Sequence, residues 1–120
     1  MTDRQITLRA AEPGDVDRIA ALFTDEGYPS GPSDIAERLG RFGSNESRVI
    51  VADHGGEVLG FIAIHAVPRF EHSDRILRIM ALVVDAGVRE RGIGRLLMEE
   101  AERIGQGMGA AWSEVTAGHH

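Results

Sequence analysis

The sequence contains no cysteine and no lysine, and all 13 of its basic residues are arginine. Without cysteine there is no disulfide framework, no Cys-ligated zinc or iron–sulfur site, and no acyl-cysteine intermediate. Without lysine there is no Schiff-base residue. His119 and His120 stand together at the end of the sequence, but two histidines without a third ligand are weak grounds for a metal site. We therefore expect no bound metal.

Positive charge and long apolar runs are also scarce. The net charge is −6 over 120 residues, which disfavours general binding to nucleic acid or anionic membranes and is compatible with a cationic small substrate. No apolar run is long enough to span a bilayer, and the first residues lack a signal-peptide pattern. We expect a single cytoplasmic domain, because the length and the 42% hydrophobic content are typical of one.

The pattern of apolar residues alternates between strand and helix periods. It predicts strands over residues 5–11, 48–53, 57–66, 75–84 and 111–116, and helices over 15–24, from Ser33 as N-cap to Phe42, and over 93–108. In the third strand we expect Val58, Gly60, Ile62 and Ile64 to share one face. Residues 79–84 are apolar on both faces, as in a strand covered by helices on both sides. The sheet should be mixed, an antiparallel meander followed by a strand–helix–strand crossover.

The segment between the fourth strand and the last helix carries the most chemistry. It reads Arg89-Glu90-Arg91-Gly92-Ile93-Gly94 and leads into an amphipathic helix. Unpaired N–H groups and a partial positive charge at a helix N-terminus attract phosphate, and glycine lets a ligand approach the backbone. The alternative is an ordinary turn with solvated arginines. A P-loop is excluded because no Gly-Lys-Ser/Thr follows, and Leu97 replaces the third glycine of a dinucleotide site.

These residues resemble the Arg/Gln-x-x-Gly-x-Gly/Ala signature of the GNAT N-acetyltransferase superfamily. The resemblance covers essentially the whole chain and extends to three further segments: residues 6–11 followed by Asp15, residues 58–62, and residues 81–84. It implies an α/β GNAT-type acyl-CoA N-acyltransferase fold, with a mixed central sheet and helices on both faces.

The resemblance also implies acetyl-CoA as donor and a primary amine as acceptor. By position, the pantetheine would bind the backbone of Leu82, Val83 and Val84, and the pyrophosphate would bind the loop formed by Arg89, Glu90, Arg91, Gly92, Ile93, Gly94 and Arg95. A strand N–H freed by a bulge near Val83 would stabilise the oxyanion. Without cysteine, direct attack by the amine in a ternary complex is the natural route.

One departure from the family concerns the end of the chain. Family members continue past residues 111–116 into a further helix, which usually carries a tyrosine that protonates the leaving thiolate, and two strands. Here the only tyrosine is Tyr28. We therefore expect one GNAT domain, residues 1–120, that is C-terminally incomplete. The alternatives to an active enzyme are a non-catalytic acyl-CoA-binding module and a truncated domain completed by a partner chain, for example in a homodimer.

The acceptor amine must lose a proton before it attacks, which requires a base or a water relay. The candidates are His65, Glu71, His72 and Glu114. His65 faces a groove or solvent depending on register, and each of the other three is equally compatible with a solvated position. In the family, the loop with Tyr28 and Pro29 helps to line the acceptor pocket, although ordinary loop packing also explains both residues.

Overall fold

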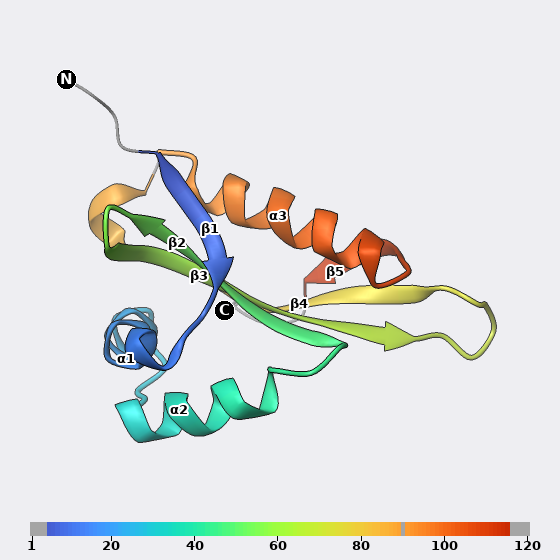
Figure 1. Ribbon diagram of the computed structural model, residues 1–120, viewed down its shortest axis with the longest axis horizontal. Helices are drawn as coiled ribbons and strands as arrows, with labels where there is room; N and C mark the ends of the chain where they lie inside the picture. Colours follow the sequence, from blue (N-terminus) through green and yellow to red (C-terminus); the bar gives the residue numbers. More distant parts are fainter. Residues whose placement is uncertain (1–4, 90, 116–120) are drawn as a thin grey trace.

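A five-stranded mixed sheet forms the centre of the protein (Figure 1). The computed structural model describes residues 5–89 and 91–115. Strands β1 to β4 are antiparallel neighbours in chain order, and β5 runs parallel to β4. The strands are β1 (Ile6–Ala10), β2 (Ser47–His54), β3 (Glu57–Pro68), β4 (Arg75–Val84) and β5 (Ala110–Val115). The expected meander and crossover are therefore confirmed.

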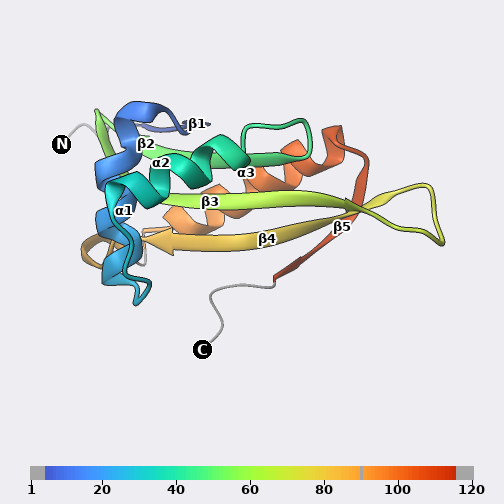
Figure 2. The ribbon, with the colours of Figure 1, turned by 90° about the horizontal axis from the view of Figure 1, so that it is seen from below.

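Three α-helices and two short 3-10 helices complete the fold. They are η1 (Pro13–Asp15), α1 (Val16–Asp25), α2 (Pro32–Arg41), η2 (Ala86–Val88) and α3 (Ile93–Gly107). Figure 2 shows α1 and α2 on one side of the sheet and α3 on the other, as expected for an α/β fold with both faces covered. No helix among the described residues is long and apolar enough to cross a membrane.

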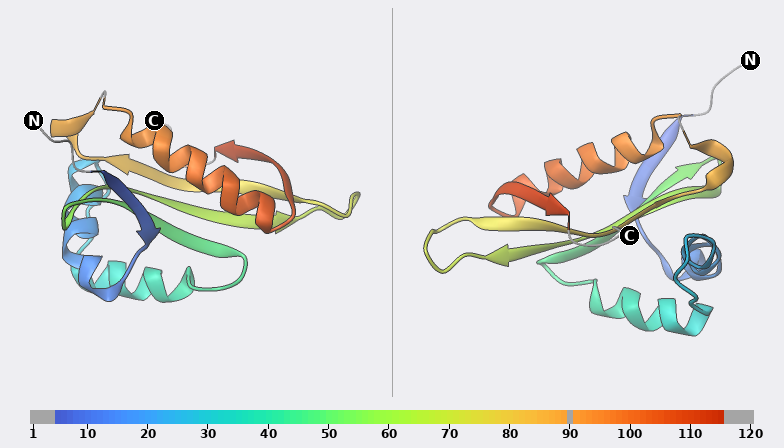
Figure 3. Two further views of the ribbon diagram at one scale, coloured as in Figure 1. Left: turned by 45° about the horizontal axis from the view of Figure 1, so that its top comes forward. Right: turned by 180° about the vertical axis from the view of Figure 1, so that it is seen from behind.

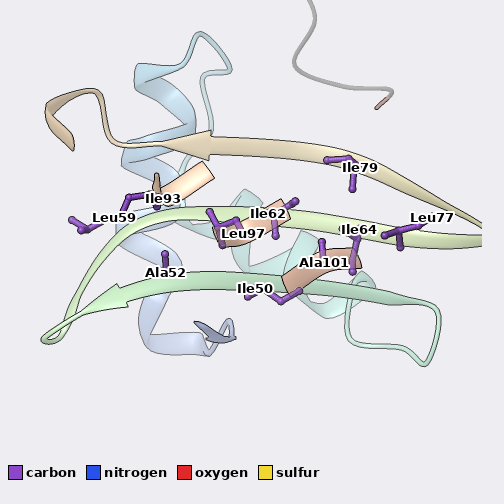
Figure 4. Packing of buried hydrophobic residues seen from close by; sticks show 10 residues of the cluster. All are labelled: Ile50, Ala52, Leu59, Ile62, Ile64, Leu77, Ile79, Ile93, Leu97 and Ala101. Atoms are coloured by element: carbon purple, nitrogen blue, oxygen red, sulfur yellow. The ribbon is translucent and has the colours of Figure 1, made fainter. Parts of the chain in front are cut away.

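The sheet separates two hydrophobic clusters. The first packs α3 against the sheet and includes Ile62, Ile64 and Leu97, all fully buried (Figure 4). The second packs α1 and α2 against the opposite face and includes Ile19, Ile35 and Phe61. Burying apolar area contributes roughly 25 cal/mol per Å² to folding. Each face of the sheet thus has its own hydrophobic cluster, and both clusters contribute to the stability of the fold.

Strand β4 is paired along its full length on one side and along half of it on the other. Its contact with β3 extends from Arg75 to Val84, whereas the pairing with β5 covers only Arg75 to Ile79. Strand β5 ends at Val115, opposite Ile79. Among the described residues, Ala81 to Val84 of β4 thus have an edge without a neighbouring strand.

Two irregularities in register change which side chains share a face. In β3, Ala52 pairs with Gly60 and Asp53 with Val58, so Leu59 is an additional residue. As a result Val58 joins Phe61 in the second cluster, and Leu59 joins Ile62 in the first. The expectation that Val58 shares a face with Ile62 is therefore wrong, because a bulge reverses the alternation.

The bulge in β4 also differs from the expectation. Ala63 pairs with Ala81 and Ile64 with Ile79, which makes Met80 the additional residue. The bulge expected near Val83 thus lies at Met80, close to where the pairing with β5 ends.

The start of α2 corrects a third expectation. The N-cap is Gly31 rather than Ser33, and Pro32 occupies the first helical position, where a missing N–H costs nothing. The backbone N–H of Gly31 donates to the Asp34 carboxylate at 3.0 Å. This bond satisfies the N–H of the N-cap residue itself, whereas the predicted serine hydroxyl would have accepted from an N–H of the first turn.

Candidate active site

A groove opens at the N-terminus of α3, beside the end of β4. It has a volume of about 420 Å³, and we call it the α3 groove; its lining residues are Glu26, Leu82, Val84, Arg89, Gly92, Ile93, Gly94 and Arg95. Seven of these belong to the signature loop or to the end of β4. The structure therefore brings together most of the residues expected to hold the donor.

Glycine is needed at the start of α3 for conformational reasons. Gly92 is the N-cap and has φ +80°, a left-handed conformation that other residues rarely adopt. The backbone N–H of Leu96 donates to the Gly92 carbonyl at 3.0 Å. The N–H groups of the first turn have no intrahelical acceptor and give this end of the helix its affinity for anions.

Because Gly94 has no side chain, the part of the α3 groove above the helix N-terminus stays open. A Cβ added at this position would lie 3.7 Å from Val84 Cγ2, an ordinary contact distance. A larger side chain at Gly94 is thus compatible with the fold but would enter the space above the helix N-terminus.

Two of the three arginines in the signature are held by carboxylates. Arg89 donates to Glu26 at the end of α1 at 2.8 Å, and Arg95 pairs with Glu99 at 3.5 Å. Arg91 is exposed. Glu26 was not anticipated from the sequence, because it lies 63 positions from Arg89 and no local pattern links the two.

Asp85 fixes the chain between β4 and η2. Its carboxylate accepts a hydrogen bond from the Gly87 N–H at 2.7 Å and pairs with Arg18 of α1. Arg18 also donates to the Val58 carbonyl at 2.8 Å. The Gly87 N–H and then the Arg18 guanidinium hold the pKa of Asp85 below its ordinary range. These bonds tie the beginning of the loop to α1 and β3.

A smaller hollow follows β4 away from the α3 groove. Its volume is about 50 Å³, and we call it the edge hollow; it is lined by Phe23, Glu26, Tyr28, Met80, Ala81, Leu82 and Val83. The Tyr28 ring stacks on Phe23 with centroids 4.8 Å apart. Tyr28 therefore lies beside β4, whereas the exposed Pro29 is absent from this lining; the role of both residues in acceptor binding stays a prediction.

The candidate bases lie elsewhere. Glu71 and His72 are exposed in the β3–β4 hairpin, which projects from the end of the sheet opposite the start of α3 (Figure 3). Strand β4 connects this hairpin to the loop before α3 and spans about 30 Å at 3.3 Å per residue. His65 is paired with Arg78 across β3 and β4, and its Nδ1 lies 2.7 Å from Ser47 Oγ. The structure does not bring these three residues to the α3 groove.

Some expectations concern residues outside the described ranges. Glu90, His119 and His120 belong to this group. Glu114 is placed only as a member of β5, opposite Arg78. Among the side chains that the structure describes, which do not include those of residues 112–115, no group of three or more His, Asp or Glu is arranged to hold a metal ion.

Comparison with known proteins identifies the family. The family model described as Acetyltransferase (GNAT) family matches residues 15–120. The chain belongs to the GNAT acetyltransferase family. A comparison with curated protein sequences gives no match.

Solved structures share the GNAT fold at low sequence identity. A GNAT family acetyltransferase from Staphylococcus aureus has a TM-score of 0.84 at 19% identity, covering 96% of this chain and 88% of the other. Glucosamine-6-phosphate N-acetyltransferase from Arabidopsis thaliana has a TM-score of 0.81 at 15% identity, with coverages of 94% and 82%. An aminoglycoside N-acetyltransferase in complex with CoA has a TM-score of 0.84 at 12% identity, with coverages of 97% and 79%.

Proposed function

We propose that this GNAT chain transfers an acetyl group from acetyl-CoA to a primary amine. The observation that carries the proposal is the α3 groove, where Gly92 and Gly94 open the helix N-terminus next to the end of β4, whose residues Ala81 to Val84 have one edge without a strand partner among the described residues. The helix N-terminus suits a pyrophosphate. The strand edge suits the amide groups of a pantetheine arm, because alternate backbone groups of an edge strand point outward.

The proposed reaction is a direct transfer. The neutral amine attacks the thioester carbonyl carbon, a C–N bond forms, and the C–S bond then breaks. The amine gives up its second proton and the CoA thiolate takes up one, so the products are an N-acetylated amine and CoA. Release of one proton from the original ammonium completes the balance. The assignment of Glu71, His72 or His65 as base stays a prediction, which Glu71→Gln, His72→Gln and His65→Gln test through the pH–rate profile.

Donor binding is tested at Gly94. We expect Gly94→Val to weaken acetyl-CoA binding by about tenfold or more in calorimetric titration, because the new side chain occupies the space above the helix N-terminus. Gly107→Val makes the same change at the other end of α3, where an added Cβ meets nothing within 4 Å. Gly107→Val should leave the affinity for acetyl-CoA unchanged. Equal affinity in the two folded variants would remove this groove from the donor site.

A second candidate function is binding of acyl-CoA without turnover. It is favoured by the lining of the α3 groove and the edge hollow, where the one described carboxylate is Glu26, already paired with Arg89. Release of free thiol from acetyl-CoA in the presence of amines separates the two functions. Tight acetyl-CoA binding with no thiol release from any amine would favour the binding module.

A further inference from the structure

A third hollow continues from the edge hollow across the sheet face under α1 and α2. We call it the apolar groove; it is lined mainly by Phe23, Leu39, Phe42, Phe61, Met80 and Ala81, with Arg38 at its side. Phe23, Met80 and Ala81 also line the edge hollow, and the edge hollow shares Glu26 and Leu82 with the α3 groove. The three hollows therefore form one path along β4.

The apolar groove has the size and surface for one ring or branched aliphatic group. Its volume is about 160 Å³, and a cavity of roughly 150 Å³ in another protein holds benzene. Phe23 meets Phe61 edge to face with centroids 5.8 Å apart, so the aromatic wall is fixed. Burying such a group removes its apolar area from water, which favours binding.

Arg38 is the one charged residue among the described residues that line the apolar groove. Its Nη1 donates to Ser30 Oγ at 2.9 Å, and no carboxylate among the described residues forms an ion pair with it. The acids nearest in sequence are engaged otherwise, since Glu37 pairs with Arg41 and Asp34 accepts from Gly31. A half-buried guanidinium with unused donors favours a carboxylate as ligand.

Charge also argues against a polycationic acceptor. In the lining of the three hollows the single described carboxylate is Glu26, which already pairs with Arg89. An aminoglycoside or polyamine carries several ammonium groups, and each needs an acidic or carbonyl partner when it leaves water. The negative net charge of the whole chain is thus not concentrated where the acceptor would bind.

We propose that the acceptor is an α-amino acid with an aromatic or branched aliphatic side chain. Its side chain occupies the apolar groove, its carboxylate pairs with Arg38, and its amine is directed toward the thioester near the Met80 bulge. The inference rests on the proposed acetyl transfer. The amine nitrogen forms the new C–N bond, CoA leaves with one proton, and an N-acetyl amino acid is produced.

A panel of amines tests this assignment in an assay of thiol release from acetyl-CoA. L-Phenylalanine and L-leucine should show kcat/KM at least about tenfold higher than glycine, 2-phenylethylamine, spermidine or an aminoglycoside. Glycine lacks the apolar group and 2-phenylethylamine lacks the carboxylate. Preference for spermidine or the aminoglycoside would overturn the inference.

Substitution of Arg38 provides the second readout. Arg38→Gln should raise KM for L-phenylalanine by about tenfold and leave KM for 2-phenylethylamine unchanged, because only the former has a carboxylate. The matched control is Arg41→Gln on the exposed side of α2, which should change neither. An equal effect of Arg38→Gln on both amines would mean that Arg38 acts through the fold and would overturn its role.

Titration with acetyl-CoA separates this inference from the function on which it rests. Failure of acetyl-CoA to bind would overturn the proposed transfer itself. Acetyl-CoA binding with acetylation of other amines but not of L-phenylalanine or L-leucine would overturn the acceptor assignment alone.

Discussion

Asp15 is a buried carboxylate, with 7% of its surface exposed, at the junction between β1 and α1. It accepts hydrogen bonds from Arg9 Nη1 at 2.8 Å, Arg9 Nη2 at 3.0 Å and the Glu12 N–H at 2.7 Å. Arg9 also donates to Asp53 of β2 at 3.1 Å. The pair thus connects the first strand, the first helix and the second strand, so its removal should be felt in the stability of the whole domain.

We expect Asp15→Asn to lower the free energy of unfolding at pH 7 by about 2 kcal/mol, since it leaves a half-buried arginine with weaker partners. Asp17→Asn, at an exposed position on the next turn, should change it by less than about 0.5 kcal/mol. Urea unfolding of the two variants and the wild type checks this. Equal effects would mean that the Arg9 pair contributes nothing.

The same carboxylate predicts a pH dependence. The hydrogen bonds from Arg9, followed by that from the Glu12 backbone, hold the pKa of Asp15 below its ordinary value, which is about 3.9. The unfolded chain therefore binds a proton first as the pH falls. The stabilisation is complete well above about pH 4 and is lost progressively below it. The difference in the free energy of unfolding between the wild type and Asp15→Asn should shrink as the pH falls from roughly 5 to 2.

The glycines of strand β3 and helix α2 differ in what surrounds them. A Cβ added to Gly60 would lie 2.8 Å from the Val83 carbonyl oxygen and 3.3 Å from Val84 Cα. Both contacts are with backbone, so β4 would have to move. Gly40 in α2 has nothing within 4 Å of an added Cβ.

We expect Gly60→Ala to destabilise the domain by about 1–3 kcal/mol, and to weaken acetyl-CoA binding because β4 carries the wall of the α3 groove. Gly40→Ala should instead stabilise by up to about 1 kcal/mol, because alanine favours a helix interior. Thermal unfolding of both variants measures the contrast. A stable Gly60→Ala variant would show that β3 and β4 separate without cost.

Periodicity was sufficient to predict the elements, because each has a strong local signal. The strand over residues 75–84 matches β4 at both ends. The bulges at Leu59 and Met80 were not predictable, since an additional residue in a strand leaves no mark in an apolar sequence. The cap of α2 was missed for a different reason: Ser33 and Gly31 are both acceptable N-caps, and Pro32 with Asp34 decides between them.

The candidate site also has one part that the sequence predicts and another part that it does not. The Gly-x-Gly loop is contiguous in sequence and was predicted as a unit. Glu26 and Arg38 reach the path along β4 from α1 and α2, and their positions depend on how these helices pack. No spacing in the sequence connects either residue with β4. Residues that act through tertiary contacts alone were therefore beyond sequence reasoning.

At the scale of the molecule, β5 forms one edge of the sheet among the described residues. An exposed strand edge favours pairing with another chain. We expect the chain to dimerise through this edge, and light scattering should then give a mass near twice 13.0 kDa. A mass of one chain at all concentrations up to about 100 μM, where weak pairing is populated, would contradict this prediction.

The two hydrophobic clusters lie on opposite faces of the sheet and are covered by different helices. Residues of α3 and the first cluster support the groove proposed for the donor, whereas α1, α2 and the second cluster form the groove proposed for the acceptor. Mutations in distant, non-contacting groups are close to additive. A library at the residues of α1 and α2 that line the proposed acceptor groove, with Arg18 and Glu26 kept because they contact Asp85 and Arg89, should therefore change which amine is recognised and leave acetyl-CoA binding unchanged.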